Sequence, residues 1–131
     1  MKKNIAMLVA TLMLSVPVLA SSYQYISAAD LKDKIDKNAQ GLLLDIQVEG
    51  EFDEHHIPGA VATFAFPVKS DTDKEKLQIF IAQAKKKSEP ITVVCPRGGG
   101  GAKRAYDYLK EQGVDESRLM ILEGGQAKWP Y

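Results

Sequence analysis

The stretch from Ile91 to Lys110 constrains the fold of this chain most strongly. Four consecutive β-branched residues, Ile91–Val94, predict a short buried strand. The strand ends at Cys95, which is the only cysteine of the sequence. Four consecutive glycines, Gly98–Gly101, then lead into a helix that we expect to begin at Ala102. The predicted order is therefore strand, cysteine, glycine-rich turn and helix.

This order favours a reactive thiolate at Cys95. Glycines carry no side chain, so successive backbone N–H groups can point into one concavity. The following helix adds unpaired N–H groups and the positive end of its dipole, and Arg97, Lys103 and Arg104 add positive charge nearby. A sulfur atom at the mouth of such a cradle prefers the anionic form. Two alternatives are a buried cysteine that caps a core strand and a phosphate-binding turn, although the Gly-Lys-Ser/Thr ending of a P-loop does not follow.

The first twenty residues have the pattern of a secretory signal peptide. Lys2 and Lys3 form a basic start, Ile5–Val16 is an apolar run, and a stretch ending at Ala20 fits a cleavage site. The apolar run is shorter than the ~20 residues that span a bilayer core. We therefore expect residues 1–20 to be cleaved on export, which would leave a periplasmic protein of residues 21–131 that is not attached to the membrane. The alternative is a retained membrane anchor.

Charge and cysteine content narrow the classes of function. The chain has 17 basic and 17 acidic residues, so nothing in its net charge favours binding to nucleic acid or to an anionic membrane surface. One cysteine cannot form an intramolecular disulfide, so in an oxidising compartment the thiol is either buried or chemically used. A chain of this length fits one domain with one sizeable core.

Strand-like and helix-like segments alternate along residues 21–131, which predicts an α/β fold with a parallel sheet of about five strands and helices on both faces. Glu49–Ala60 is expected to be a surface loop or a one-turn helix, and its adjacent histidines lack a third metal ligand at suitable spacing. In such sheets ligands bind at the carboxyl ends of strands, where Cys95 is placed. The predicted strands are Tyr23–Ile26, Leu42–Leu44, Val61–Phe66, Ile91–Val94 and Leu119–Leu122, and the predicted helices are Ala28–Lys37, Asp71–Lys87 and the one that begins at Ala102.

Four features in this order resemble a single rhodanese domain. They are Asp45 after an apolar strand, the run HIPGA at residues 56–60, Cys95 at a strand end, and Gly124-Gly125 followed by Trp129. The resemblance covers essentially all of residues 23–129. It implies a rhodanese-like fold and a sulfurtransferase in which Cys95 carries sulfane sulfur as a persulfide.

The resemblance also implies a mechanism. The Cys95 thiolate attacks the outer sulfur of thiosulfate, a polysulfide or a persulfide donor, and the bound sulfur then passes to cyanide or to a thiol. The acceptor is a small molecule or a protein, and no metal or organic cofactor is required. The residues expected to bind the substrate are Arg97, Gly98, Gly99, Gly100, Gly101 and Lys103.

The sequence departs from the family pattern near the cysteine. Gly100 stands where many rhodaneses have a basic residue, and Gln47 stands where an arginine is common. The loop after Cys95 is one residue longer than in typical sulfurtransferases, as in rhodanese-fold phosphatases and arsenate reductases, but it lacks their late arginine. Those enzymes are one alternative, and a non-catalytic sulfur carrier or interaction module is another. His56 is expected to fix the following turn, and Asp45 is expected to cap the strand end or to bind loop backbone.

Overall fold

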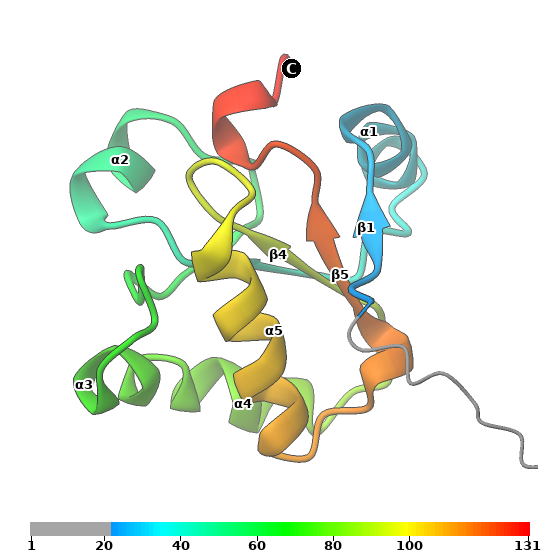
Figure 1. Cartoon of the computed structure of the whole chain (residues 1–131). Coiled ribbons are helices and arrows are strands. Elements are labelled where there is room, and N and C mark those ends of the chain that lie inside the picture. The colour runs from blue at the N-terminus through cyan, green and yellow to red at the C-terminus, as the bar shows by residue number, and fades with distance from the viewer. Residues whose placement is uncertain (1–21) are drawn as a thin grey trace, which may run out of the picture.

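A computed structural model describes residues 22–131, so the expected signal peptide at residues 1–20 lies outside the described residues. The chain forms one parallel sheet with the strand order β1-β5-β4-β2-β3 (Figure 1). The predicted α/β class and five-stranded parallel sheet are confirmed. The strands are β1 (Tyr25–Ile26), β2 (Leu42–Asp45), β3 (Val61–Ala62), β4 (Ile91–Val94) and β5 (Leu119–Leu122).

Helices cover both faces of the sheet, as predicted. Figure 1 shows α4 and α5 on one side and α1 on the other. In the described part of the chain no helix is both long enough and apolar enough to cross a bilayer. The helices are α1 (Ala28–Asp36), α2 (Glu49–Glu54), α3 (Asp71–Glu75), α4 (Gln78–Ala84) and α5 (Gly100–Glu111), with 3₁₀ turns η1 (Glu116–Arg118) and η2 (Gln126–Lys128).

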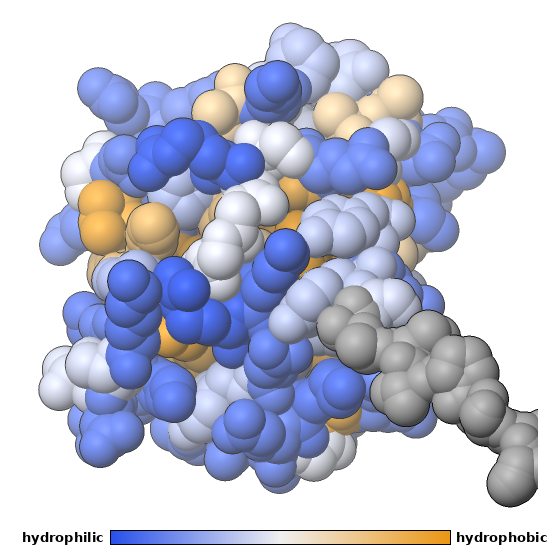
Figure 2. All heavy atoms as spheres, viewed as in Figure 1, coloured by the Kyte–Doolittle hydropathy of each residue, from blue (hydrophilic) through white to orange (hydrophobic). Residues whose placement is uncertain are grey.

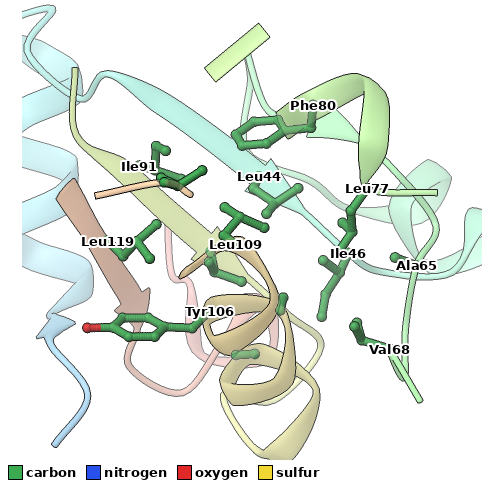
Figure 3. Packing of buried hydrophobic residues seen from close by; sticks show 14 of the residues in the cluster. Leu44, Ile46, Ala65, Val68, Leu77, Phe80, Ile91, Tyr106, Leu109 and Leu119 are labelled. Carbon is green, nitrogen blue, oxygen red and sulfur yellow. The ribbon is translucent and has the colours of Figure 1, made fainter. Parts of the chain in front are cut away.

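The core consists of two clusters because successive residues of a strand point to opposite faces of the sheet. Leu44 packs with residues of α4 and α5 on one face, as Figure 3 shows for Phe80 and Leu109. Its neighbour Leu43 packs on the other face with Leu31 of α1. This two-sided burial explains why the central strands are continuous apolar runs in the sequence. The parallel pairing of β2 with β4, in which Asp45 lies opposite Val94, places the carboxyl ends of these strands side by side.

The single helix expected over Asp71–Lys87 is wrong, because the structure divides it into α3 and α4. Ser70 and Asp73 form a capping box at the start of α3, but α3 buries none of its residues. Leu77 and the following apolar residues are buried against the sheet. A polar first turn has no apolar face to bury, so the chain bends before Leu77 and only α4 packs on the core.

Other boundaries differ more modestly. α5 begins at Gly100 rather than Ala102, and β1 is limited to two residues. β3 is also an edge strand of two residues. After it the backbone turns at Phe64, which has a positive φ of 58°, and the N–H of Phe66 donates to the carbonyl of Ile46. This turn places Phe66 next to the glycine-rich loop.

Candidate functional site

Cys95 lies at the carboxyl end of β4, and only 2% of its surface is exposed. The backbone N–H of Gly98 donates a hydrogen bond to Cys95 Sγ at 2.8 Å. Gly98 has a φ of +78°, a conformation that glycine adopts without strain. α5 starts two residues later, so its positive end and its unpaired N–H groups lie at the loop. Both features stabilise negative charge on the sulfur.

A pocket of about 150 Å³ opens over the thiol. Its size suits a small anion or a short sulfur chain rather than a bulky substrate. Figure 2 shows pale surface where the glycine-rich loop lies, with an apolar patch beside it and hydrophilic side chains above and below. We call the pocket over Cys95 the thiol pocket. It is lined by Phe66, Cys95, Pro96, Arg97, Gly99, Gly100 and Gly101.

Phe66 is a wall of the thiol pocket that sequence analysis did not identify. A Cβ atom added to Gly101 would lie 3.4 Å from the Phe66 ring, so the absence of a side chain there lets the ring pack closely. The segment is held from α5, because Arg104 Nε donates to the carbonyl of Pro67 at 2.9 Å. The sequence predicted that Phe66 ends a strand over Val61–Phe66, but β3 ends at Ala62, and Phe66 lies in an irregular segment after it.

The Gly124-Gly125 turn and the residues after it contact the backbone of the Cys95 loop. The N–H of Gln126 donates to the Cys95 carbonyl at 2.8 Å, and the N–H of Ala127 donates to the Pro96 carbonyl at 2.9 Å. A Cβ atom on Gly125 would lie 2.4 Å from the Cys95 carbonyl oxygen and 2.5 Å from Gly98 N. The Gly124-Gly125 turn therefore packs directly against the backbone that carries the thiol.

Asp45 is fully buried at the end of β2 and anchors a polar network beside the loop. Its carboxylate accepts from the backbone N–H of Gln47 at 2.8 Å and from Gln47 Nε2 at 3.1 Å. Gln47 Nε2 also donates to the His55 carbonyl, and Gln126 Nε2 lies 3.3 Å from His55 Nδ1. Asp45 thus binds backbone and fixes neighbouring side chains, as the sequence suggested.

Burial raises the pKa of the Asp45 carboxyl above its ordinary value of 3.8, although the two Gln47 donors and the charge of His56 act in the opposite direction. The folded state therefore holds this proton more tightly than the unfolded chain does. It follows that the free energy of unfolding decreases as pH rises through the folded pKa. We expect the Asp45→Asn variant to lose this contribution, so its stability relative to the wild type increases as the pH rises from about 4 through the raised pKa of Asp45.

Urea unfolding of both proteins at several pH values measures this difference. The absolute stability of the variant also reflects its altered hydrogen bonds with Gln47, but that contribution is constant with pH. A difference that stays flat across the range would contradict the raised pKa of Asp45.

The structure brings most of the predicted site residues together, but Lys103 lies elsewhere. Arg97 is exposed at the rim of the thiol pocket. Lys103 Nζ instead lies 5.6 Å from the centre of the Tyr23 ring. Arg104 is nearer the loop, because a Cβ on Gly100 would lie 2.8 Å from its guanidinium. Arg97 and Arg104 are thus the cations that flank the glycines.

The two histidines have different surroundings. The His56 ring stacks on Phe52 at 3.9 Å, and His56 Nδ1 lies 2.8 Å from the Phe52 carbonyl oxygen. Both contacts join His56 to Phe52 of α2, and the expectation that His56 fixes the following turn stays a prediction. His55 faces the buried amide of Gln126. Among residues 22–131 no three His, Cys, Asp or Glu side chains are grouped so that they could hold a metal ion.

Two known proteins with sulfurtransferase names are similar to this chain in sequence. YtwF of Bacillus subtilis (strain 168), a candidate sulfurtransferase by its name, is 32% identical over 107 residues, which are 79% of this chain and 87% of that protein. The adenylyltransferase and sulfurtransferase MOCS3 of Drosophila grimshawi is 34% identical over 88 residues, which are 67% of this chain. The chain spans only 18% of the length of MOCS3.

Solved structures share the fold. The crystal structure of a rhodanese-like domain protein from Staphylococcus aureus superposes with a TM-score of 0.61 at 24% identity, and the match covers 81% of this chain and 90% of that one. The family model for the rhodanese-like domain matches residues 27–130, which include β2, the Cys95 loop and the Gly124-Gly125 turn. This chain therefore belongs to the rhodanese-like family.

Proposed function

We propose that the protein is a sulfurtransferase that carries sulfane sulfur as a persulfide on Cys95. One observation carries the proposal most directly. Cys95 Sγ accepts an N–H from the glycine-rich loop at 2.8 Å, at the N-terminus of a twelve-residue helix. A site of this kind stabilises both a thiolate and the negative outer sulfur of a persulfide. The sulfurtransferase names of the two relatives support the same reaction class.

The reaction is a double displacement. The Cys95 thiolate attacks the outer sulfur of thiosulfate, a new S–S bond forms, and sulfite leaves with the electron pair of the broken bond. The Cys95–S–S⁻ product lies in the thiol pocket, where the loop N–H groups and Arg97 face negative charge. An acceptor thiolate or cyanide then attacks the outer sulfur and regenerates the Cys95 thiolate. A thiolate attacks directly, so this scheme needs no general base beside the cysteine.

Intact mass spectrometry of the purified protein tests the proposal. We expect incubation with thiosulfate or polysulfide to add about 32 Da per sulfur atom, and we expect cyanide to remove the added mass. A steady-state assay with an excess of acceptor then distinguishes an enzyme, which turns over many times, from a carrier, which transfers one equivalent. If neither donor adds mass but vanadate or arsenate binds at the loop, the oxyanion alternative replaces this proposal.

A further inference from the structure

A second pocket of about 200 Å³ lies beside the thiol pocket and has a different character. We call it the acidic pocket. It shares Pro96 and Arg97 with the thiol pocket, so the two spaces meet along one short piece of the loop. The other residues that matter here are Glu51, Glu54, His55 and Gln126. Nothing in the transfer of sulfur to Cys95 uses these side chains.

The acidic pocket carries more negative than positive charge. The carboxylates of Glu51 and Glu54 are both exposed to it. Within residues 22–131 the ion pairs involve neither of these glutamates nor Arg97. Arg97 is the one lysine or arginine side chain in the lining. The pocket therefore favours a cationic group.

A buried amide in the lining also lacks a partner. Gln126 is only 4% exposed. Its Nε2 lies 3.3 Å from His55 Nδ1, but in the described part of the protein its Oε1 has no hydrogen-bond partner. A buried polar atom without a partner destabilises the folded protein. The residues of the lining thus supply two exposed carboxylates and one buried carbonyl oxygen without a partner, and all of these groups are hydrogen-bond acceptors.

We propose that the acidic pocket binds the ammonium group of an aminothiol acceptor, of which cysteamine and cysteine are the simplest members. An ammonium group supplies three N–H donors and a positive charge, which match the acceptors of this lining. The inference deepens the proposed function and rests on it for the transfer step. The acceptor's thiol loses its proton to solvent, and its thiolate attacks the outer sulfur of Cys95–S–S⁻. The S–S bond to Cys95 breaks, its electron pair returns to Cys95 Sγ, and the acceptor leaves as a persulfide.

This arrangement sorts the two substrates of the double displacement by charge. An anionic donor such as thiosulfate meets loop N–H groups and Arg97 in the thiol pocket. An acceptor with an ammonium group is held by Glu51 and Glu54 on the other side of Pro96 and Arg97. Both substrates act on the same sulfur atom, but they are bound in two different pockets that share Pro96 and Arg97.

Single-turnover transfer from the persulfide form to a series of thiols tests the proposal. The series is cysteamine, 2-mercaptoethanol and 3-mercaptopropionate, which carry an ammonium, a neutral and a carboxylate group. We expect the E51Q/E54Q variant to lose about fivefold in rate constant with subsaturating cysteamine and to be unchanged with 2-mercaptoethanol, because two exposed ion pairs are lost. E89Q is the matched control, since Glu89 lies at the opposite end of β4 from Cys95.

Raising the KCl concentration is expected to separate cysteamine from 2-mercaptoethanol in the wild-type protein as well, without any substitution. The cysteamine rate is expected to fall with salt, and the 2-mercaptoethanol rate is expected to stay constant. If the variant or the salt slows both thiols equally, or slows neither, the ammonium site is excluded.

A binding measurement separates this proposal from the proposed function. Cysteamine is titrated into the Cys95→Ser protein, which cannot form a persulfide, and the Gln47 and Gln126 side-chain amide resonances are followed by NMR. We expect both to shift with cysteamine and not with 2-mercaptoethanol, and the shifts to be lost in E51Q/E54Q. Shifts without any persulfide in the wild type would sustain the pocket and reject the sulfur transfer. Absence of shifts up to millimolar cysteamine would overturn the pocket, whether or not Cys95 carries sulfur.

Discussion

Replacement of Cys95 by serine is expected to abolish sulfur transfer and to leave the fold intact. The serine hydroxyl fits the space of the buried thiol and accepts the same N–H from Gly98. However, a hydroxyl is not ionised near neutral pH and does not form a stable oxygen–sulfur link to the donor. We therefore expect at least a ~10³-fold loss of thiocyanate formation from thiosulfate and cyanide, with a change in the free energy of unfolding within about 1 kcal/mol.

The stability of the serine variant must be measured as well, because an unfolded variant would also be inactive. Urea unfolding, followed by the fluorescence of the buried Trp129, shows whether the serine variant is folded at the assay temperature. A folded variant without activity places the chemistry on the thiol. A folded variant that retains more than about a tenth of the wild-type rate would contradict persulfide catalysis at Cys95.

The part of the candidate site that contains Cys95 and the glycines after it is the part that the sequence predicts best. A β-branched run that ends at Cys95 and four glycines that follow it determine strand, turn and helix locally. The supporting part depends on contacts between segments far apart in the chain. The approach of Gly125 to the Cys95 carbonyl and the position of Phe66 against Gly101 follow from the packing of β5 and of the segment after β3, which no local pattern specifies.

Arg104, and not Lys103, lies beside the glycine-rich loop, and the start of α5 differs from the predicted one. Glycine is a poor helix former, so the sequence suggests a helix that begins at Ala102. α5 in fact begins at Gly100. Arg104 is then one turn beyond Gly100 and meets it, whereas Lys103 points toward the Tyr23 ring. The structure thus places Arg104, rather than Lys103, next to Gly100, and which cation binds the substrate stays a prediction.

Substitution of Gly125 by alanine is expected to have the largest effect of any change outside the thiol itself. Gly125 has φ and ψ of 61° and −162°, a region that is essentially restricted to glycine. The added Cβ would also lie 2.4 Å and 2.5 Å from two backbone atoms, the Cys95 oxygen and Gly98 N, and backbone cannot rotate aside as a side chain can. We expect the free energy of unfolding to fall by about 3 kcal/mol or more.

The same substitution should also displace the loop that holds the thiol. Of the atoms near the added methyl group, only the Cys95 oxygen is closer than Gly98 N. Gly98 N is also the donor to Cys95 Sγ. A loop that moves to relieve this contact loses the aligned N–H, so we expect at least a ~10²-fold lower transfer rate in whatever fraction of the protein remains folded. Urea unfolding and the thiocyanate assay measure the two effects separately.

Two other glycines separate the causes of this loss. Gly59 has a φ of +90°, but a Cβ there meets nothing within 4 Å, so Gly59→Ala reports backbone strain alone, about 1–2 kcal/mol. Gly50 lies within α2 in open space, so Gly50→Ala should stabilise the protein by about 0.5–1 kcal/mol. If the Gly125 variant is no less stable than the Gly59 variant and keeps its activity, the contact between the Gly124-Gly125 turn and the Cys95 loop does not hold the thiol in place. Suppose instead that the Gly125 variant loses far more stability than Gly59→Ala and also loses transfer activity. Gly125, about thirty residues downstream of Cys95, would then be as much a part of the site as the glycines that follow the cysteine.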